Sequence, residues 1–98
     1  MKRVIWAEAA TTDLANIKAY LTENYGAALA ENHISALILS ARWLLDYPGS
    51  GTLLGIGNHR KWRPRKLWHI LVYQPVADGI QVMRVRHERS NWYPVPKD

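Results

Sequence analysis

The residue pattern changes character at Pro48-Gly49, and this change restricts the possible folds more than any other feature. Before it, apolar residues recur every three or four positions, which is the period of an amphipathic helix. After it, short runs of β-branched and aromatic residues are separated by turn-forming residues, a pattern typical of strands. A chain of 98 residues is too short to build two separate cores. The sequence therefore predicts one α+β domain in which the helices precede most of the strands.

Two helices are predicted in the first half, over residues 8–24 and 27–46, with Gly26 between them. Each has one apolar face, and the link between them is short, so we expect an antiparallel helical hairpin. The residues of the two faces are Ala10, Leu14, Ile17 and Leu21, followed by Ala30, Ile34, Leu37, Ala41 and Leu44.

Strand-forming runs lie on both sides of the helices. A short strand is predicted over residues 2–6, and three more over 59–63, 66–74 and 80–87. Because Asp78-Gly79 is a typical hairpin turn, we expect the last three to form an antiparallel three-stranded meander. Residues 48–58 contain four glycines and are predicted to be a loop. The expected domain covers residues 1–92, and residues 93–98 are expected to be a C-terminal tail.

The last predicted strand changes from apolar to cationic along its length. Strict alternation places its residues on two faces, so we expect the strand to leave the core near its C-terminal end. One face would carry Ile80, Val82, Arg84 and Arg86, and the other Gln81, Met83, Val85 and His87.

The charge of the chain is unevenly distributed. The formal net charge is +5, but residues 1–49 carry a net −1 and residues 50–98 a net +6. This asymmetry fits either an anionic partner for the second half or a solvated, solubilising strand face. The absence of cysteine excludes a disulfide scaffold, a thiolate metal site and a cysteine nucleophile, and suits a reducing cytosol. The longest apolar stretch, residues 34–45, is too short to span a bilayer, so no membrane partner is expected.

The order and spacing of several motifs resemble toxins of the RelE/ParE superfamily from bacterial type II toxin–antitoxin systems, and the ParE branch more closely than the RelE branch. The resemblance covers nearly the whole chain. The residues that carry it are Trp6, Ala10-x-x-Asp13-Leu14-x-x-Ile17-x-x-Tyr20-Leu21, Leu44-Leu45-x-x-Pro48-x-x-Gly51, Arg60, Ile70-Leu71-Val72-Tyr73, and Gly79-Ile80-x-Val82-x-Arg84-Val85-x-His87-x-Arg89-x-x-Trp92.

The resemblance implies a toxin neutralised by a small ParD-like antitoxin, with which it would form a hetero-oligomer in the cytoplasm. We expect an amphipathic antitoxin segment on the apolar seams of the hairpin and sheet, with its acidic side chains towards the arginines. The candidate antitoxin-binding residues are Leu14, Ile17, Leu21, Ile38 and Leu45. No cofactor or metal is implied, and neither His59 nor His69 has the spacing of a metal ligand. His33, on the apolar edge of the second helix, is expected to pack in the core or at the helix boundary.

Two modes of action remain open. Toxins of the ParE branch act on DNA gyrase without catalysis of their own, whereas those of the RelE branch cleave messenger RNA in the ribosomal A site without metal. Cleavage needs a proton acceptor, a proton donor and cations at the phosphate, for which His87 is the candidate acid or base. Because the chain has an incomplete set of the catalytic residues of the RelE branch, the gyrase hypothesis is favoured. The candidate target-binding residues are Arg60, Arg84, Arg86, His87, Arg89 and Trp92.

Two residues depart from the resemblance. Many ParE-like toxins have Arg where this chain has Thr52, and Asp where it has Asn91. Both positions are close to the surface that the family uses, so a third hypothesis is a basic binding domain of this fold that is no longer toxic.

Overall fold

The computed structural model describes residues 2–87. The predicted domain end at residue 92 and the predicted tail lie outside the described residues. The elements in chain order are β1 (Arg3–Trp6), α1 (Glu8–Tyr25), α2 (Ala27–Asp46), β2 (Thr52–Leu53), β3 (Arg60–Trp62), β4 (His69–Val76) and β5 (Gly79–His87). The α+β fold class is confirmed.

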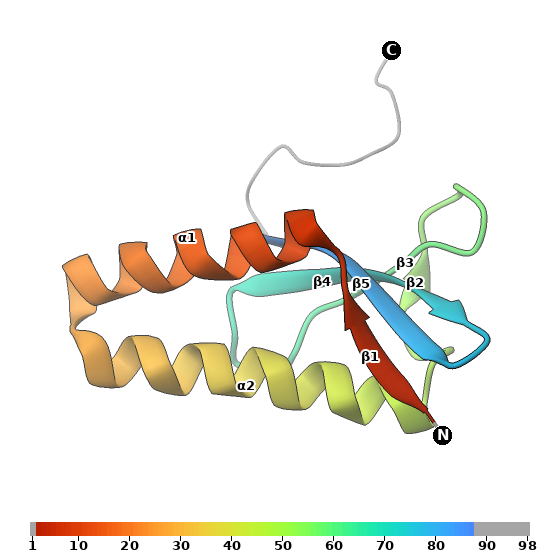
Figure 1. The fold of residues 1–98 in the computed structure, drawn as a ribbon, viewed down its shortest axis with the longest axis horizontal. Coiled ribbons are helices and arrows are strands. Elements are labelled where there is room, and N and C mark those ends of the chain that lie inside the picture. Colours follow the sequence, from red (N-terminus) through yellow and green to blue (C-terminus); the bar gives the residue numbers. More distant parts are fainter. Residues whose placement is uncertain (1, 88–98) are drawn as a thin grey trace, which may run out of the picture.

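The two helices form the predicted hairpin, with bounds within one residue of those expected. Gly26 alone separates them, with φ of 96°, a value that favours glycine. Its N–H donates to the carbonyl oxygen of Thr22 at 3.0 Å and so satisfies one of the last carbonyls of α1. Figure 1 shows the closed end of the hairpin extending beyond the sheet.

The sheet has five strands in the order β1-β5-β4-β3-β2. The predicted meander is present as β3, β4 and β5, but it is extended at both edges. On one edge β1 pairs in parallel with β5, from Arg3 opposite Gly79 to Trp6 opposite Val82. Gly79 is required there, because a Cβ would collide with the backbone of Arg3. The three-stranded prediction was incomplete because a parallel pair between the two ends of the chain leaves no local turn signal.

The other edge strand, β2, lies inside the segment predicted as a loop. Thr52 and Leu53 pair with Lys61 and Arg60. Tyr73 holds the segment that leads into this strand. Its hydroxyl donates to the carbonyl oxygen of Pro48 at 2.7 Å and accepts from the N–H of Gly51 at 2.9 Å. Tertiary contacts therefore make a strand of a glycine-rich segment that has little strand propensity of its own.

A β-bulge corrects the predicted faces of β5. Val72 pairs with Arg84 and Tyr73 pairs with Val82, so Met83 has no partner and the alternation shifts by one residue. After the bulge Val85 lies on the same face as Ile80 and Val82, in the core. Arg84 and Arg86 lie on the opposite face, and not with Ile80 and Val82 as strict alternation predicted.

The core lies between both helices and one face of the sheet. It is built from Ala10 of α1, from residues of α2, and from β4 and β5. The α2 and strand members are Leu37, Ala41, Leu44, Leu71, Tyr73, Ile80, Val82 and Val85. The helices cover this face only. The opposite face carries Lys61, Ile70, Val72, Arg84 and Arg86 and is referred to as the open face of the sheet, although Ile70 and Val72 at its centre are themselves buried. Among the described residues, neither helix combines the length and apolarity needed to cross a membrane.

Candidate functional site

The C-terminal end of β5 carries three of the predicted target-binding residues. Arg84 and Arg86 lie on the open face, opposite Val72 and Ile70 of β4, whereas His87 pairs with His69 on the helix side of the sheet. The arginines and the histidine therefore lie on opposite faces of the strand, as alternation predicts, and the bulge at Met83 decides that the histidine faces the helices. Arg89 and Trp92, together with Asn91, lie outside the described residues.

Arg84 is held by a carboxylate of α1. Its Nε and Nη2 donate to the two oxygens of Asp13 at 2.8 and 3.0 Å, and the N–H of Val85 donates to Asp13 Oδ2 at 2.9 Å. Although burial alone raises the pKa of Asp13, the hydrogen bonds from Arg84 and Val85 and the charges of Arg84 and Arg86 lower it overall. The bond to Asp13 raises the pKa of Arg84. Asp13 thus binds the exposed edge of β5 beyond Val82, where β1 no longer pairs with it.

Arg86 is in a different situation. It lies two residues further along the same face, and its buried Nε has no hydrogen-bond acceptor among residues 2–87. An unsatisfied buried donor costs free energy. Among the described residues no salt bridge of Arg86 is found.

Arg60 is placed away from this end of the sheet. It pairs with Tyr73, four positions along β4 from the His69–His87 pair. Its Nη1 donates to the carbonyl oxygens of Gly49 at 3.1 Å and Gly51 at 2.6 Å, so its guanidinium holds the approach to β2. The structure does not bring Arg60 together with Arg84, Arg86 and His87.

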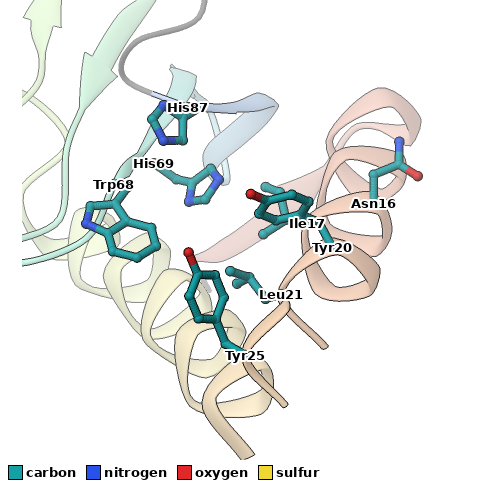
Figure 2. A pocket seen from close by; sticks show the side chains of 8 residues that line it. All are labelled: Asn16, Ile17, Tyr20, Leu21, Tyr25, Trp68, His69 and His87. Carbon is teal, nitrogen blue, oxygen red and sulfur yellow. The ribbon is translucent and has the colours of Figure 1, made fainter. Parts of the chain in front are cut away.

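A pocket of about 590 Å³ lies beside His87, between α1 and the ends of β4 and β5 (Figure 2). Figure 2 shows side chains of α1 on one side and Trp68, His69 and His87 on the other. Its lining residues are Asn16, Ile17, Tyr20, Leu21, Tyr25, Trp68, His69 and His87. Because none of these is a Lys, Arg, Asp or Glu, the pocket suits an apolar or aromatic group with neutral hydrogen-bonding atoms.

Three histidines from three elements cluster beside this pocket, which His69 and His87 line and His33 does not. His33 Nε2 of α2 lies 2.9 Å from His69 Nδ1 of β4, and the rings of His69 and His87 are 5.4 Å apart edge to face. Burial, followed by the charges of His33 and His87, lowers the pKa of His69 to about 4. Burial also lowers the pKa of His33. Both rings are therefore neutral at pH 7, and one donates to the other.

Sequence reasoning missed this cluster. The expectation that His33 packs in the core is confirmed, since it is 9% exposed. Its contact with His69, 36 residues away, left no signal in the sequence, because only the long-range packing of α2 on β4 creates it. Within residues 2–87 no group of histidine, aspartate or glutamate side chains has the arrangement of a metal site.

The candidate antitoxin-binding residues do not form one seam. Ile17 and Leu21 line the pocket beside His87, although Leu21 is only 1% exposed. Ile38 and Leu45 line a second groove of about 370 Å³ between β1 and α2, and Leu14 packs against the core. The other residues of this groove are Lys2, Arg3, Val4, Trp6 and Arg42. The apolar floor of the second groove thus has a cationic rim.

The charge of the sheet is of one sign. The five described strands contain Arg3, Arg60, Lys61, Arg84 and Arg86 but no Asp or Glu. Asp13, from α1, is the acidic group that reaches Arg84. The open face of the sheet therefore has the electrostatic character of an anion-binding surface.

Comparison with known proteins agrees with this fold. A family model described as the ParE toxin of the type II toxin–antitoxin system parDE matches residues 4–92. A solved structure described as the chromosomal ParDE toxin–antitoxin system from P. aeruginosa superposes with a TM-score of 0.78 at 17% identity, covering 89% of this chain and 96% of that one. No curated protein matches the chain. The chain therefore belongs to the ParE toxin family of type II toxin–antitoxin systems, and it has the fold of the RelE/ParE superfamily.

Proposed function

We propose that this toxin inhibits DNA gyrase by binding to it, without catalysing a reaction of its own. The observation that carries the proposal is the cationic end of β5, where Arg84 and Arg86 lie on a sheet whose described strands contain no acidic residue. Membership of the ParE family supports the same target, since the ParE branch is the one expected to act on gyrase. Gyrase is a cytoplasmic enzyme, so we place the toxin in the cytoplasm.

The chemistry around His87 supports the non-catalytic mode. Cleavage of RNA at neutral pH needs groups that exchange protons near that pH. The nearest other imidazole, that of His69, has a pKa of about 4 and is a poor acid or base at pH 7. His33 is buried behind it.

We further propose that a ParD-like antitoxin neutralises the toxin by occupying both apolar grooves in a hetero-oligomer. The ring-lined pocket suits an apolar or aromatic antitoxin side chain. The second groove, with Lys2, Arg3 and Arg42 at its rim, suits an amphipathic segment with acidic residues.

The proposal is tested with purified toxin and gyrase. We expect inhibition of supercoiling and accumulation of cleaved DNA, and in a growing host filamentation with DNA-damage signalling. Adding the antitoxin should reverse the inhibition. Toxin that is folded, as judged by circular dichroism, and leaves supercoiling unaffected at saturating concentration contradicts the proposal.

Ribosome-dependent cleavage of messenger RNA is a second candidate function. The observation that favours it is the position of His87 at the rim of a ring-lined pocket that could accept a base. It predicts an immediate stop in translation with A-site cleavage, and loss of that activity in His87→Ala. Antitoxin binding of this variant serves as the folding control. A chain without either activity would fit the third hypothesis, a binding domain that is no longer toxic.

A further inference from the structure

We propose that the open face of the sheet binds the phosphate backbone of double-stranded DNA. This inference extends the proposed function and rests on it, because DNA is close to the toxin when the toxin binds a gyrase molecule that holds DNA. The toxin would then contact the DNA as well as the enzyme.

Three basic residues lie in register across the open face. Lys61 of β3 and Arg84 of β5 both lie opposite Val72 of the central strand β4, so they flank it in one row. Arg86 lies opposite Ile70, two residues further along. Strands lie about 4.8 Å apart and rise about 3.3 Å per residue, so the backbone positions of these three residues form a triangle with sides of roughly 7 to 12 Å. An array of cations on a rigid sheet suits a repeating anion such as a phosphate backbone.

The two arginines of the open face differ in their pairing. Asp13 pairs with Arg84 and holds its guanidinium in place. Arg86 forms no salt bridge with another described residue, so no carboxylate of residues 2–87 competes for it. The guanidinium of Arg86 suits a phosphate group, because guanidinium groups bind phosphate through several N–H groups at once.

A pair of neutral polar side chains lies beside these basic residues. Gln74 and Gln81 lie opposite each other, and Gln74 Nε2 donates to Gln81 Oε1 at 2.9 Å. Side-chain amides commonly bind the phosphate and sugar oxygens of DNA next to lysine and arginine. The five described strands contribute no acidic side chain that would repel the backbone.

The test measures binding of a fluorescently labelled DNA duplex by anisotropy at several salt concentrations. We expect Arg86→Gln and Lys61→Gln each to weaken binding about 3- to 10-fold at 50 mM salt, and each to reduce the slope of log K against log salt by about 0.9, since one phosphate contact is lost. Arg65→Gln is the matched control, because it removes an exposed arginine from the loop between β3 and β4. This control should keep the wild-type slope.

Three results would overturn the inference: wild-type slopes in both variants, an equal loss in Arg65→Gln, or tighter binding to RNA of the same length than to DNA. The two substitutions lie on different strands, so misfolding of one variant leaves the other as the test. Gyrase inhibition separates this inference from the proposed function. Inhibition that Lys61→Gln leaves unchanged rejects a role for DNA contact but keeps gyrase as the target, because Lys61 is not one of the candidate target-binding residues. Salt-dependent DNA binding through these residues without any inhibition of gyrase keeps the DNA surface and rejects the proposed function.

Discussion

At the scale of single residues, Asp13 joins the helical layer to the sheet. Its carboxylate accepts three hydrogen bonds, two from Arg84 and one from the N–H of Val85, while its side chain is 12% exposed. Sequence analysis singled out Asp13 only as part of a motif on the first helix. Its partners are more than 70 residues away, so no local pattern indicates its role in holding β5.

Replacing Asp13 should destabilise the fold in a pH-dependent manner. We expect Asp13→Asn to lower the free energy of unfolding by about 1–2 kcal/mol at pH 7, a value reduced because Arg84 is partly exposed. The folded-state pKa of Asp13 lies below its unfolded value of 3.8, so its contribution is complete above that pH and is lost as the pH falls through the folded pKa. Urea unfolding at pH 7 and pH 3 measures the difference. Glu23→Gln, an exposed substitution on the same helix, is the control, and an equal effect there would refute the assignment.

The neutral pair of His33 and His69 predicts a second pH dependence. Because the folded-state pKa of His69 is about 4 and its unfolded value 6.5, the stabilisation is complete above pH 6.5 and is lost as the pH falls towards 4. We expect a loss of about 2–3 kcal/mol over that range. The variant His69→Gln can still hydrogen-bond to His33 but does not titrate, so its stability should depend less on pH. Chemical denaturation between pH 7 and pH 4 tests this, and parallel curves for the two proteins would contradict it.

At the scale of elements, the helices were predictable and parts of the sheet were not. The apolar periodicity and Gly26 set both helices to within one residue, because an amphipathic helix carries its signal within its own length. β2 and the bulge at Met83 depend on contacts with distant parts of the chain. Tyr73 and Arg60 hold the segment that leads into β2, and the bulge arises from the register shift between β4 and β5. The bulge is why Arg84 and Arg86 were predicted on the wrong face.

The hydroxyl of Tyr73 should control the stability of β2. It is buried and bonds both to Pro48 and to Gly51, where a Cβ would lie only 2.7 Å from that hydroxyl. We expect Tyr73→Phe to cost about 1–3 kcal/mol, since it leaves the N–H of Gly51 without its acceptor. Faster hydrogen exchange at Gly51 and in β2 should accompany this loss.

The matched control is Tyr47→Phe, because Tyr47 is 53% exposed and its contact with Trp43 is a ring stack that phenylalanine preserves. We expect it to change the free energy of unfolding by less than about 0.5 kcal/mol. Equal effects of the two substitutions would show that the buried hydroxyl does not hold the loop.

At the scale of the whole molecule, the uneven charge of the chain can be assigned to a part of the fold. The sequence places its basic excess after residue 49, and the fold concentrates much of it in a sheet whose described strands have no acidic residue. The location of the candidate surfaces was less predictable. Alternation does predict that His87 lies on the opposite face of β5 from the arginines. It does not predict that four of the five candidate antitoxin-binding residues lie in two grooves that share no lining residue, while Leu14 lines neither. Which of these residues share a groove depends on tertiary packing, and the helical periodicity of the sequence does not specify that packing.

The separation of the two grooves leads to a prediction about the antitoxin. Tyr20 is 60% exposed at the ring-lined pocket, and Ile38 lines the second groove. If one antitoxin chain occupies both grooves, Tyr20→Ala and Ile38→Ala should each weaken binding by about 1–2 kcal/mol, and the losses should add in the double variant because distant sites act independently. Leu39→Ala is the control, since Leu39 is next to Ile38 on α2 but lines neither groove. Calorimetric titration with the antitoxin measures all four variants. A loss in only one of the single variants would limit the antitoxin to that groove, and a loss in Leu39→Ala equal to that in Ile38→Ala would move the contact to the outer face of α2.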